Sequence, residues 1–313
     1  MWGFFFGVLT PASPLVTNGK RRNEVQMQYS SGQDWLKSDN KQAMLFAMSG
    51  LGKTYISNML REAGNWFHYS VDYRIGTRYM GEHIVDNFKR EAMKTPFLAE
   101  LLRSDSIYIA SNITFENLDP LSTYLGKPGN SDHGGIAIEE YLKRQEQHRH
   151  AEVASLLDTQ HFIARAREIY GYKNFIGDSG GSICEVVDPH DDDDPVLKSL
   201  SENLLMVWIE GSDAHTQELT RRFDKSPKPM YYQRDILKDA WSTYLNENNT
   251  QPGDVDPNAF IRWAYKRAVS HRQPIYRAMA DNWGVTVSAD DVSKIRSESD
   301  FNELIAKAID ARM

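Results

Sequence analysis

Lys53 and Thr54, which follow two closely spaced glycines, have the types and spacing needed to bind a phosphate group. Glycine lets backbone N–H groups turn toward phosphate oxygens, a lysine here can reach the β and γ phosphates, and a threonine hydroxyl can hold Mg²⁺. Against the phosphate-loop pattern G-x-x-x-x-G-K-[ST], the chain departs at Ala47, where the first glycine usually stands. The predicted nucleotide-binding residues of the loop are Ser49, Gly50, Leu51, Gly52, Lys53 and Thr54.

The segments on either side of this loop are those that a phosphate loop requires. Residues 43–47 are apolar and predict a buried strand, and residues 55–63 predict a helix directly after the loop. A helix points the positive end of its dipole at a ligand bound to its first turn, which favours phosphate. The alternative is an ordinary strand-to-helix turn with a surface lysine, but the order of strand, loop and helix favours nucleotide binding.

Acidic residues follow two further predicted strands. Residues 65–72 predict a strand that ends at Asp72, with Arg74 close behind it, and residues 173–178 predict a strand that ends at Asp178. The carboxyl ends of parallel strands meet at one edge of a sheet. We therefore expect Asp72, with Tyr73 and Arg74 just after it, to face the same crevice as the phosphate loop.

Composition excludes several classes of protein. The chain has 313 residues and a net charge of −7, and its 36 basic residues do not form a stripe, which argues against nucleic acid as a partner. The single cysteine, Cys184, excludes an internal disulfide and fits a reducing compartment, so we expect a cytoplasmic protein. No apolar run reaches the length of a membrane span, so a membrane is not an expected partner either.

Residues 1–42 differ in composition from the rest of the chain. Residues 1–9 are apolar, but they lack the positive charges and the clean cleavage site of a signal peptide. Residues 15–42 are polar and show no periodicity. We interpret residues 1–42 as a leader that is disordered or loosely packed.

The remaining residues, 43–313, predict one α/β domain. Residues 204–209 are apolar throughout, as in a central parallel strand. A helical insertion is expected at about 84–170, with a helix over 85–102 and a loop-rich stretch at 104–135. A helical C-terminal part is expected at about 232–281. The predicted fold is a three-layer α/β/α arrangement with a central parallel sheet and a helical insertion.

In this order, the motifs resemble those of shikimate kinase and related small-molecule kinases such as gluconate kinase, which are P-loop NTPases. Besides the phosphate loop, the resemblance rests on four short segments. Residues 71–75 (VDYRI) resemble the family's strand-end aspartate, and residues 178–181 (DSGG) resemble its glycine-rich strand end. Residues 228–231 (KPMY) are similar to the end of its lid, and residues 272–281 (RQPIYRAMAD) to its Arg-x-Pro-Leu-Tyr segment.

The resemblance implies roles for the matched residues. In the family, the strand-end aspartate binds the acceptor hydroxyl and helps to deprotonate it, the Gly-Gly turn lets the backbone approach the substrate, and a late arginine binds the substrate carboxylate. The residues so assigned to the substrate are Asp72, Arg74, Gly180, Gly181 and Arg272. The residues assigned to ATP, in addition to the loop, are Arg221, Arg222 and Lys228.

Departures from the family indicate a rebuilt substrate side. Lys228 replaces a lid arginine, which keeps the charge but loses a bidentate grip on phosphate. A long segment separates Asp72 from the Gly-Gly turn, where the family's substrate-binding segment lies, and within it Arg149 and Glu152 match the family's Arg-x-x-Glu. Shikimate itself is therefore not the expected substrate.

The sequence predicts Mg²⁺-dependent phosphoryl transfer from ATP to a hydroxyl of a small polar, anionic metabolite. Lys53, Asp72 and Arg272 are the expected catalytic residues, and Thr54 and Asp178 are the expected metal-binding residues, Asp178 through a bound water. One alternative is a P-loop ATPase or nucleotide switch whose helical insertion binds a protein partner. Another is a kinase that acts on a macromolecular acceptor. Whether ATP consumption requires an added acceptor separates the kinase from the ATPase.

Overall fold

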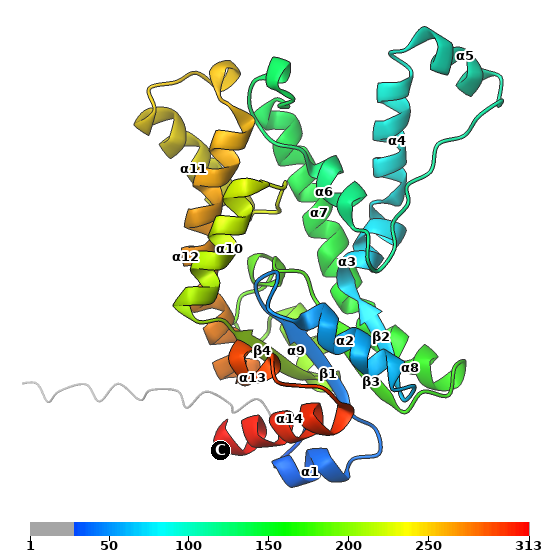
Figure 1. Ribbon diagram of the computed structural model, residues 1–313, viewed down its shortest axis with the longest axis vertical. Coiled ribbons are helices and arrows are strands. Elements are labelled where there is room, and N and C mark those ends of the chain that lie inside the picture. Colours follow the sequence, from blue (N-terminus) through cyan, green and yellow to red (C-terminus); the bar gives the residue numbers. More distant parts are fainter. Residues whose placement is uncertain (1–27, 313) are drawn as a thin grey trace, which may run out of the picture.

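A parallel sheet of five strands organises residues 28–312, the part of the chain that the computed structural model describes (Figure 1). In spatial order the strands are β2 (Trp66–Ser70), β3 (Asn174–Asp178), β1 (Gln42–Phe46), β4 (Leu205–Glu210) and β5 (Gly284–Ser288). Each neighbouring pair of these strands is parallel. The predicted α/β fold with a central parallel sheet is confirmed.

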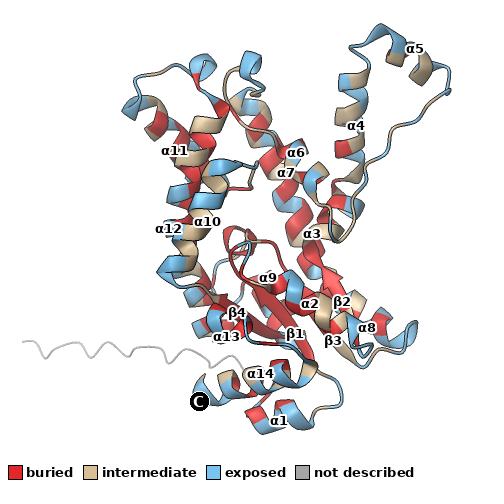
Figure 2. Cartoon of the chain, in the orientation of Figure 1, coloured by how far each residue is buried: buried red, intermediate tan, exposed pale blue. Residues whose placement is uncertain are grey.

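β1 is the central strand and is buried along its whole length (Figure 2). Its residue Leu45 lies level with Asp178 of β3 on one side and with Val207 of β4 on the other. The chain builds the sheet on the β3 side of β1 first and then crosses to the β4 side. Ligands of open α/β sheets bind outside the carboxyl ends of the strands at such a change of direction, which here is the end of β1.

Helices cover both faces of the sheet and give three layers. α2 (Lys53–Glu62) and α14 (Glu298–Arg312) lie on one face, in front of the sheet in Figure 1. α8 (Thr159–Glu168), α9 (Pro195–Asn203) and the C-terminal half of α12 (Pro257–Trp283) pack against the other face. The three-layer α/β/α arrangement therefore matches the prediction.

Two groups of helices rise above the carboxyl ends of the strands (Figure 1). The first, here called the insertion arm, consists of α3 (Val71–Arg74), the π-helix η1 (Ile75–Tyr79), α4 (Gly81–Ala92), α5 (Pro96–Arg103), α6 (Asp119–Leu125), η2 (Ser131–His133) and α7 (Ile138–Leu157). The second, here called the C-terminal arm, consists of α10 (Asp213–Lys225), α11 (Arg234–Glu247), η4 (Pro252–Asp254) and the N-terminal half of α12. Two short helices, η3 (Ile183–Glu185) and α13 (Ala289–Val292), follow β3 and β5. Within residues 28–312, no helix combines the length and the apolar character needed to cross a membrane.

α7 joins the two arms. The hydroxyl of Tyr141 and the side-chain amide of Gln145 both donate to the carbonyl of Met230, and the amide oxygen of Gln145 accepts from the backbone N–H of Tyr232. Around Tyr141, aromatic residues such as Trp241 form a second hydrophobic core between α7, α11 and α12. α7 thereby fixes the segment that follows α10 and borders the candidate site.

The start of the described chain differs from the prediction of a loosely packed leader. Residues 28–41 contain α1 (Gly32–Lys37), whose Trp35 is fully buried against Trp66 of β2 and against α14. One large ring in a polar segment is enough to anchor it, although it produces no periodic signal. The part of the predicted leader at residues 1–27 lies outside the described residues.

The insertion arm differs from the prediction in how its helices divide. The helix expected over residues 85–102 is two helices, α4 and α5, because Pro96 begins a new helix and cannot continue the preceding one. The short helix α6 was expected as loop. Its second residue is Pro120. A helix tolerates proline in its first turn, but in a sequence proline is typical of loops.

Candidate functional site

The phosphate loop connects β1 to α2. Gly50 and Gly52 have φ angles of +85° and +97°, a region that favours glycine. Ala47 has no positive φ, so the backbone does not require glycine at that place. Lys53 is buried, and its Nζ donates to the carbonyls of Ala47 at 2.8 Å and Met48 at 3.0 Å. The ammonium group is therefore held inside the loop by carbonyl oxygens.

A cavity of about 370 Å³ opens at this loop and brings four predicted residues together. Lys53 and Thr54 line it from α2, Asp178 lines it from β3, and Asp72 lines it from α3. Burial lowers the pKa of Lys53, and the negative charges of Asp178 and Asp72 oppose that shift. Mg²⁺ prefers oxygen ligands and is usually bound by one or two carboxylates, waters and substrate phosphates. The hydroxyl of Thr54 and the carboxylate of Asp178 are a donor set that fits this ion.

His68 also lies in this first cavity, although the sequence analysis did not select it. Its Nε2 lies 3.1 Å from Oδ2 of Asp178, and both side chains are buried. The ring lies 5.0 Å from that of Phe115, and within the described residues its Nδ1 has no hydrogen-bond partner. The only sequence signal is a histidine two residues before the end of an aromatic strand. Asp178 thus reaches the cavity as a carboxylate paired with histidine.

The sequence predicted Asp72 at the end of β2, but the residue lies in the first turn of α3. Ser70 ends the strand, and its hydroxyl accepts a backbone N–H of α3. The carboxylate lies over Gly180, where a Cβ would come within 2.5 Å of Oδ1 of Asp72. Burial, followed by the negative charge of Asp178, raises the pKa of Asp72 to about 6, while Lys53 lowers it. Asp72 is therefore a basic carboxylate packed against a glycine turn.

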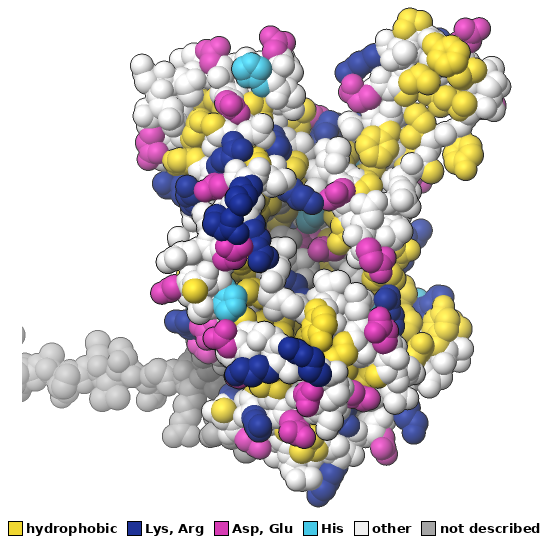
Figure 3. Space-filling model, in the orientation of Figure 1, with side chains coloured by type: hydrophobic (Ala, Val, Ile, Leu, Met, Phe, Trp, Pro, Cys, Tyr) yellow, Lys and Arg dark blue, Asp and Glu magenta, His cyan; other side chains and the backbone are white. Residues whose placement is uncertain are grey.

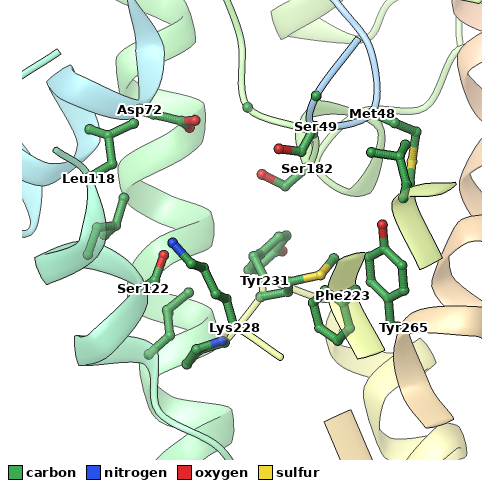
Figure 4. Close-up of a pocket in the computed structure, with 18 of the residues that line it drawn as sticks. Met48, Ser49, Asp72, Leu118, Ser122, Ser182, Phe223, Lys228, Tyr231 and Tyr265 are labelled. Atoms are coloured by element: carbon green, nitrogen blue, oxygen red, sulfur yellow. The ribbon is translucent and has the colours of Figure 1, made fainter. Parts of the chain in front are cut away.

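A second cavity, of about 480 Å³, adjoins the first. In Figure 4, Asp72 comes from the insertion arm and its carboxylate points toward Ser49 and Ser182, while Phe223 and Tyr231 line the opposite part of the cavity. The residues that line both cavities are Ser49, Gly50, Asp72, Leu118, Gly180 and Gly181. A molecule in the second cavity can therefore approach the phosphate loop past the carboxylate of Asp72.

Arg272 borders the second cavity, and its guanidinium already has partners. Nε donates to Oε1 of Glu185 at 2.7 Å, Nη1 to the carbonyl of Gly181 at 2.9 Å, and Nη2 to the carbonyl of Tyr231 at 2.7 Å. Only 3% of the residue is exposed. In this structure the residue expected to bind a substrate carboxylate holds the Gly-Gly turn and the segment after α10 in place.

We expect Arg272→Met to lower the free energy of unfolding by about 3 kcal/mol or more, because it leaves Glu185 buried without its counterion. Urea unfolding at pH 7 measures the change. Arg277→Met is the matched control on the same helix, because Arg277 pairs with Glu210 at an exposed site and should cost less than about 1 kcal/mol. Equal losses in the two variants would contradict the role of Arg272 as a buried clamp.

The other predicted cations divide into two groups. Arg222 and Lys228 line the second cavity, on the side of the C-terminal arm, where Figure 3 shows Lys and Arg side chains gathered. Arg222 pairs with Glu218 on its own helix, and Lys228 pairs with Asp119 of α6. Arg221 is exposed, pairs with the same Glu218 and lines neither cavity. Arg74 also lines neither cavity, because its guanidinium pairs with Asp158 at the end of α7, 2.7 Å away.

A buried acid and a buried histidine lie beside the second cavity. Oε1 of Glu152 accepts from the hydroxyl of Ser182 at 2.8 Å, and Oε2 lies 3.6 Å from Nδ1 of His148. Neither Oε2 nor Nδ1 has a hydrogen-bond partner within the described residues. Burial and the charge of Asp72 raise the pKa of Glu152 to about 8, and burial lowers the pKa of His148 to about 4. Arg149, the other residue of the Arg-x-x-Glu match, is exposed.

Glu152 should make stability fall as the pH rises from 7 to 8. The folded protein keeps the proton until about pH 8, whereas an unfolded glutamate has lost it, so the folded state binds more protons in this range. The stability that protonated Glu152 contributes is complete at low pH and is lost as the pH rises through about 8. The expected loss between pH 7 and pH 8 is about 1 kcal/mol.

Urea unfolding at the two pH values measures this loss. The variant Glu152→Gln has no carboxyl group to titrate, so its stability should change less over the same range. His148 does not obscure the comparison, because its lowered pKa keeps it neutral in the folded protein at both pH values. Parallel profiles for the wild type and the variant would refute the assignment.

Comparisons with known proteins do not assign the chain to a family. No family model matches it, and no curated protein matches it. Among solved structures, the crystal structure of shikimate kinase from Bacteroides thetaiotaomicron at 1.7 Å resolution is similar, with a TM-score of 0.34 and 11% sequence identity. The match covers 86% of this chain and 96% of that chain. The strand order and the loop, and not this likeness, define the fold.

Proposed function

We propose that this protein transfers the γ-phosphoryl group of ATP to a hydroxyl of a small molecule, with Mg²⁺. The observation that carries the proposal is that two cavities meet at one carboxylate. The first contains the phosphate loop, the second has room for an acceptor, and Asp72 lines both. Phosphoryl transfer depends on placing the donor and the acceptor in line, which two adjoining cavities would allow.

On the donor side, the backbone N–H groups at Gly50 and Gly52 would bind the phosphates, and Lys53 would exchange its carbonyl partners for phosphate oxygens. Thr54 and Asp178 would hold the metal ion, which neutralises charge on the transferring group. The nucleoside would lie in a third cavity on the other side of the loop. That cavity has a volume of about 420 Å³, and its lining includes Leu51, Tyr55, His215, Val292 and Arg296.

On the acceptor side, Asp72 would accept the proton of the attacking hydroxyl. Its pKa of about 6 leaves it ionised at pH 7 and basic enough to take part in the transfer. The products would be ADP, the phosphorylated acceptor and the released proton. Arg222 and Lys228 would stabilise negative charge on the nucleotide or on an anionic substituent of the acceptor. Because ATP is the donor, we retain the cytoplasm as the expected location.

Release of ADP from ATP and Mg²⁺, measured with and without a panel of hydroxyl-bearing metabolites, tests this function. We expect ADP release to depend on an added acceptor and a phosphorylated product to appear in equal amount. ADP release that no member of the panel changes would favour the alternative, an ATPase or nucleotide switch.

One observation favours that alternative function. The outer end of the insertion arm exposes large apolar side chains, including Phe97 on α5 and Tyr108 after it (Figure 3). Exposed apolar groups of this kind are typical of surfaces that bind another protein. In this alternative, the nucleotide state of the loop would control the binding of a protein partner to α4 and α5.

A further inference from the structure

Apolar side chains form most of the second cavity, and polar side chains line it in two places. Ser49, Asp72 and Ser182 lie beside the phosphate loop, and Ser122 and Lys228 lie farther from it (Figure 4). Most of the remaining lining is apolar and comes from both arms. The cavity therefore offers polar partners to the end of a ligand at the loop and to one further substituent, and an apolar environment to the rest of it.

The apolar part has two facing walls. Leu118, Leu121 and Leu125 are three and four residues apart at α6, the spacing that places side chains on one face of a helix. Leu219 and Phe223, four residues apart on α10, line the cavity from the C-terminal arm. Hydroxyl groups held against such walls would lose hydrogen bonds to water without gaining protein partners. Ser122, on the same helix, offers one hydroxyl among these leucines, so a polyol with hydroxyls on all sides is a poorer fit than a ligand with few polar groups.

We propose, building on the proposed function, that the acceptor is an amphipathic alcohol whose hydroxyl lies at Asp72 and whose apolar ring or chain packs between α6 and α10. Cavities of this size accommodate molecules larger than a simple sugar acid. Arg222 and Lys228 line the same cavity, where Arg222 pairs with Glu218 at 2.7 Å and Lys228 with Asp119 at 2.8 Å. An anionic substituent of the acceptor would take the place of one of these carboxylates. The expected class is a hydroxylated aromatic or aliphatic acid.

Two hydroxy acids of equal charge test the class of acceptor. 4-(Hydroxymethyl)benzoate carries its hydroxyl on an apolar ring, whereas quinate carries several hydroxyls on a polar ring. Calorimetric titration of each acid into the full-length protein, saturated with ADP and Mg²⁺, should give an affinity about tenfold or more higher for the benzoate. Tighter binding of quinate, or binding of neither acid, would overturn the proposal.

Variants of the apolar wall locate the binding. Leu121→Asn and Phe223→Asn, one from each wall, should each weaken binding of the benzoate about fivefold or more, with the affinity for ADP unchanged, because neither residue lines the cavity at the phosphate loop. Phe223 is half-buried, so at least one of the two variants should retain its fold. Leu157→Asn, at an exposed position at the end of α7, is the matched control and should bind the benzoate as the wild type does. Unchanged binding in both wall variants would place the ligand elsewhere and overturn the proposal.

Failure of the inference and failure of the proposed function give different results. ADP release with quinate or gluconate, but not with the benzoate, would support the kinase function and contradict the inference that its acceptor is largely apolar. Tight binding of the benzoate without any ADP release would support the apolar ligand site and contradict the proposed kinase function.

Discussion

Lys53→Ala should reduce acceptor-dependent ADP release by about a thousandfold or more. Nζ of Lys53 lies inside the phosphate loop, 2.8 Å and 3.0 Å from the carbonyls of Ala47 and Met48, where it can move onto a phosphate oxygen. Alanine removes the positive charge that this position brings to the transferring group. The rate is measured at saturating ATP and Mg²⁺ with the metabolite that supports the most ADP release in the wild type.

Lys94→Ala serves as the control for the loss of a lysine. Lys94 is exposed, pairs with Glu91 three residues earlier, and lies between α4 and α5, so its removal should leave the rate unchanged. Urea unfolding of both variants separates a lost charge from a lost fold. Full turnover by Lys53→Ala would remove the assignment of the phosphate loop.

The strand, loop and helix that form the candidate phosphate loop could be predicted because their signals are local. An apolar strand, two glycines, a lysine and a helix lie within about twenty consecutive residues, and each of them has a direct physical reason to adopt its structure. β4 could be predicted for a similar reason, because a strand buried on both faces is apolar throughout. These elements define the centre of the sheet and one half of the candidate site.

The second half of the site depends on contacts between distant segments. Glu152 meets Ser182 from 30 positions away, and His68 meets Asp178 from 110 positions away. α7 carries many charges, which are typical of a solvated face, and nothing in its sequence distinguishes the buried Glu152 from exposed neighbours such as Arg149. Such pairs become visible only when the fold brings the segments together.

The role of an arginine could not be predicted from its place in a motif. Arg74 lies two residues after Asp72 in the sequence motif, yet the turn of α3 directs it toward Asp158. Arg272 reaches the expected cavity, but Glu185 and two carbonyls already occupy its donors. A motif gives the position of a residue along the chain, whereas its partners depend on the packing around it.

Asp72→Asn should lower phosphoryl transfer by about a thousandfold and leave the affinity for ATP within about twofold of the wild type. Asparagine keeps the shape of the side chain over Gly180 but cannot accept the proton of the hydroxyl. Transfer is followed by product formation with the best acceptor of the panel, and ATP affinity by calorimetric titration. Asp239→Asn, at an exposed position on α11, is the matched control and should behave as the wild type.

The pH dependence of the wild type distinguishes a proton acceptor from a residue that only shapes the site. Because Asp72 must be ionised to accept the proton, kcat/KM should decline as the pH falls below about 6, the pKa to which burial and Asp178 raise it. A profile that stays flat down to pH 5 would show that no group of this pKa controls the reaction. If Asp72→Asn instead loses ATP binding, the carboxylate acts through the metal or through the structure of the loop. Another group must then accept the proton of the acceptor hydroxyl. We expect Asp72→Asn to retain ATP binding and lose transfer, while kcat/KM of the wild type declines below about pH 6. These results together would identify Asp72 as the group that accepts the proton of the acceptor hydroxyl.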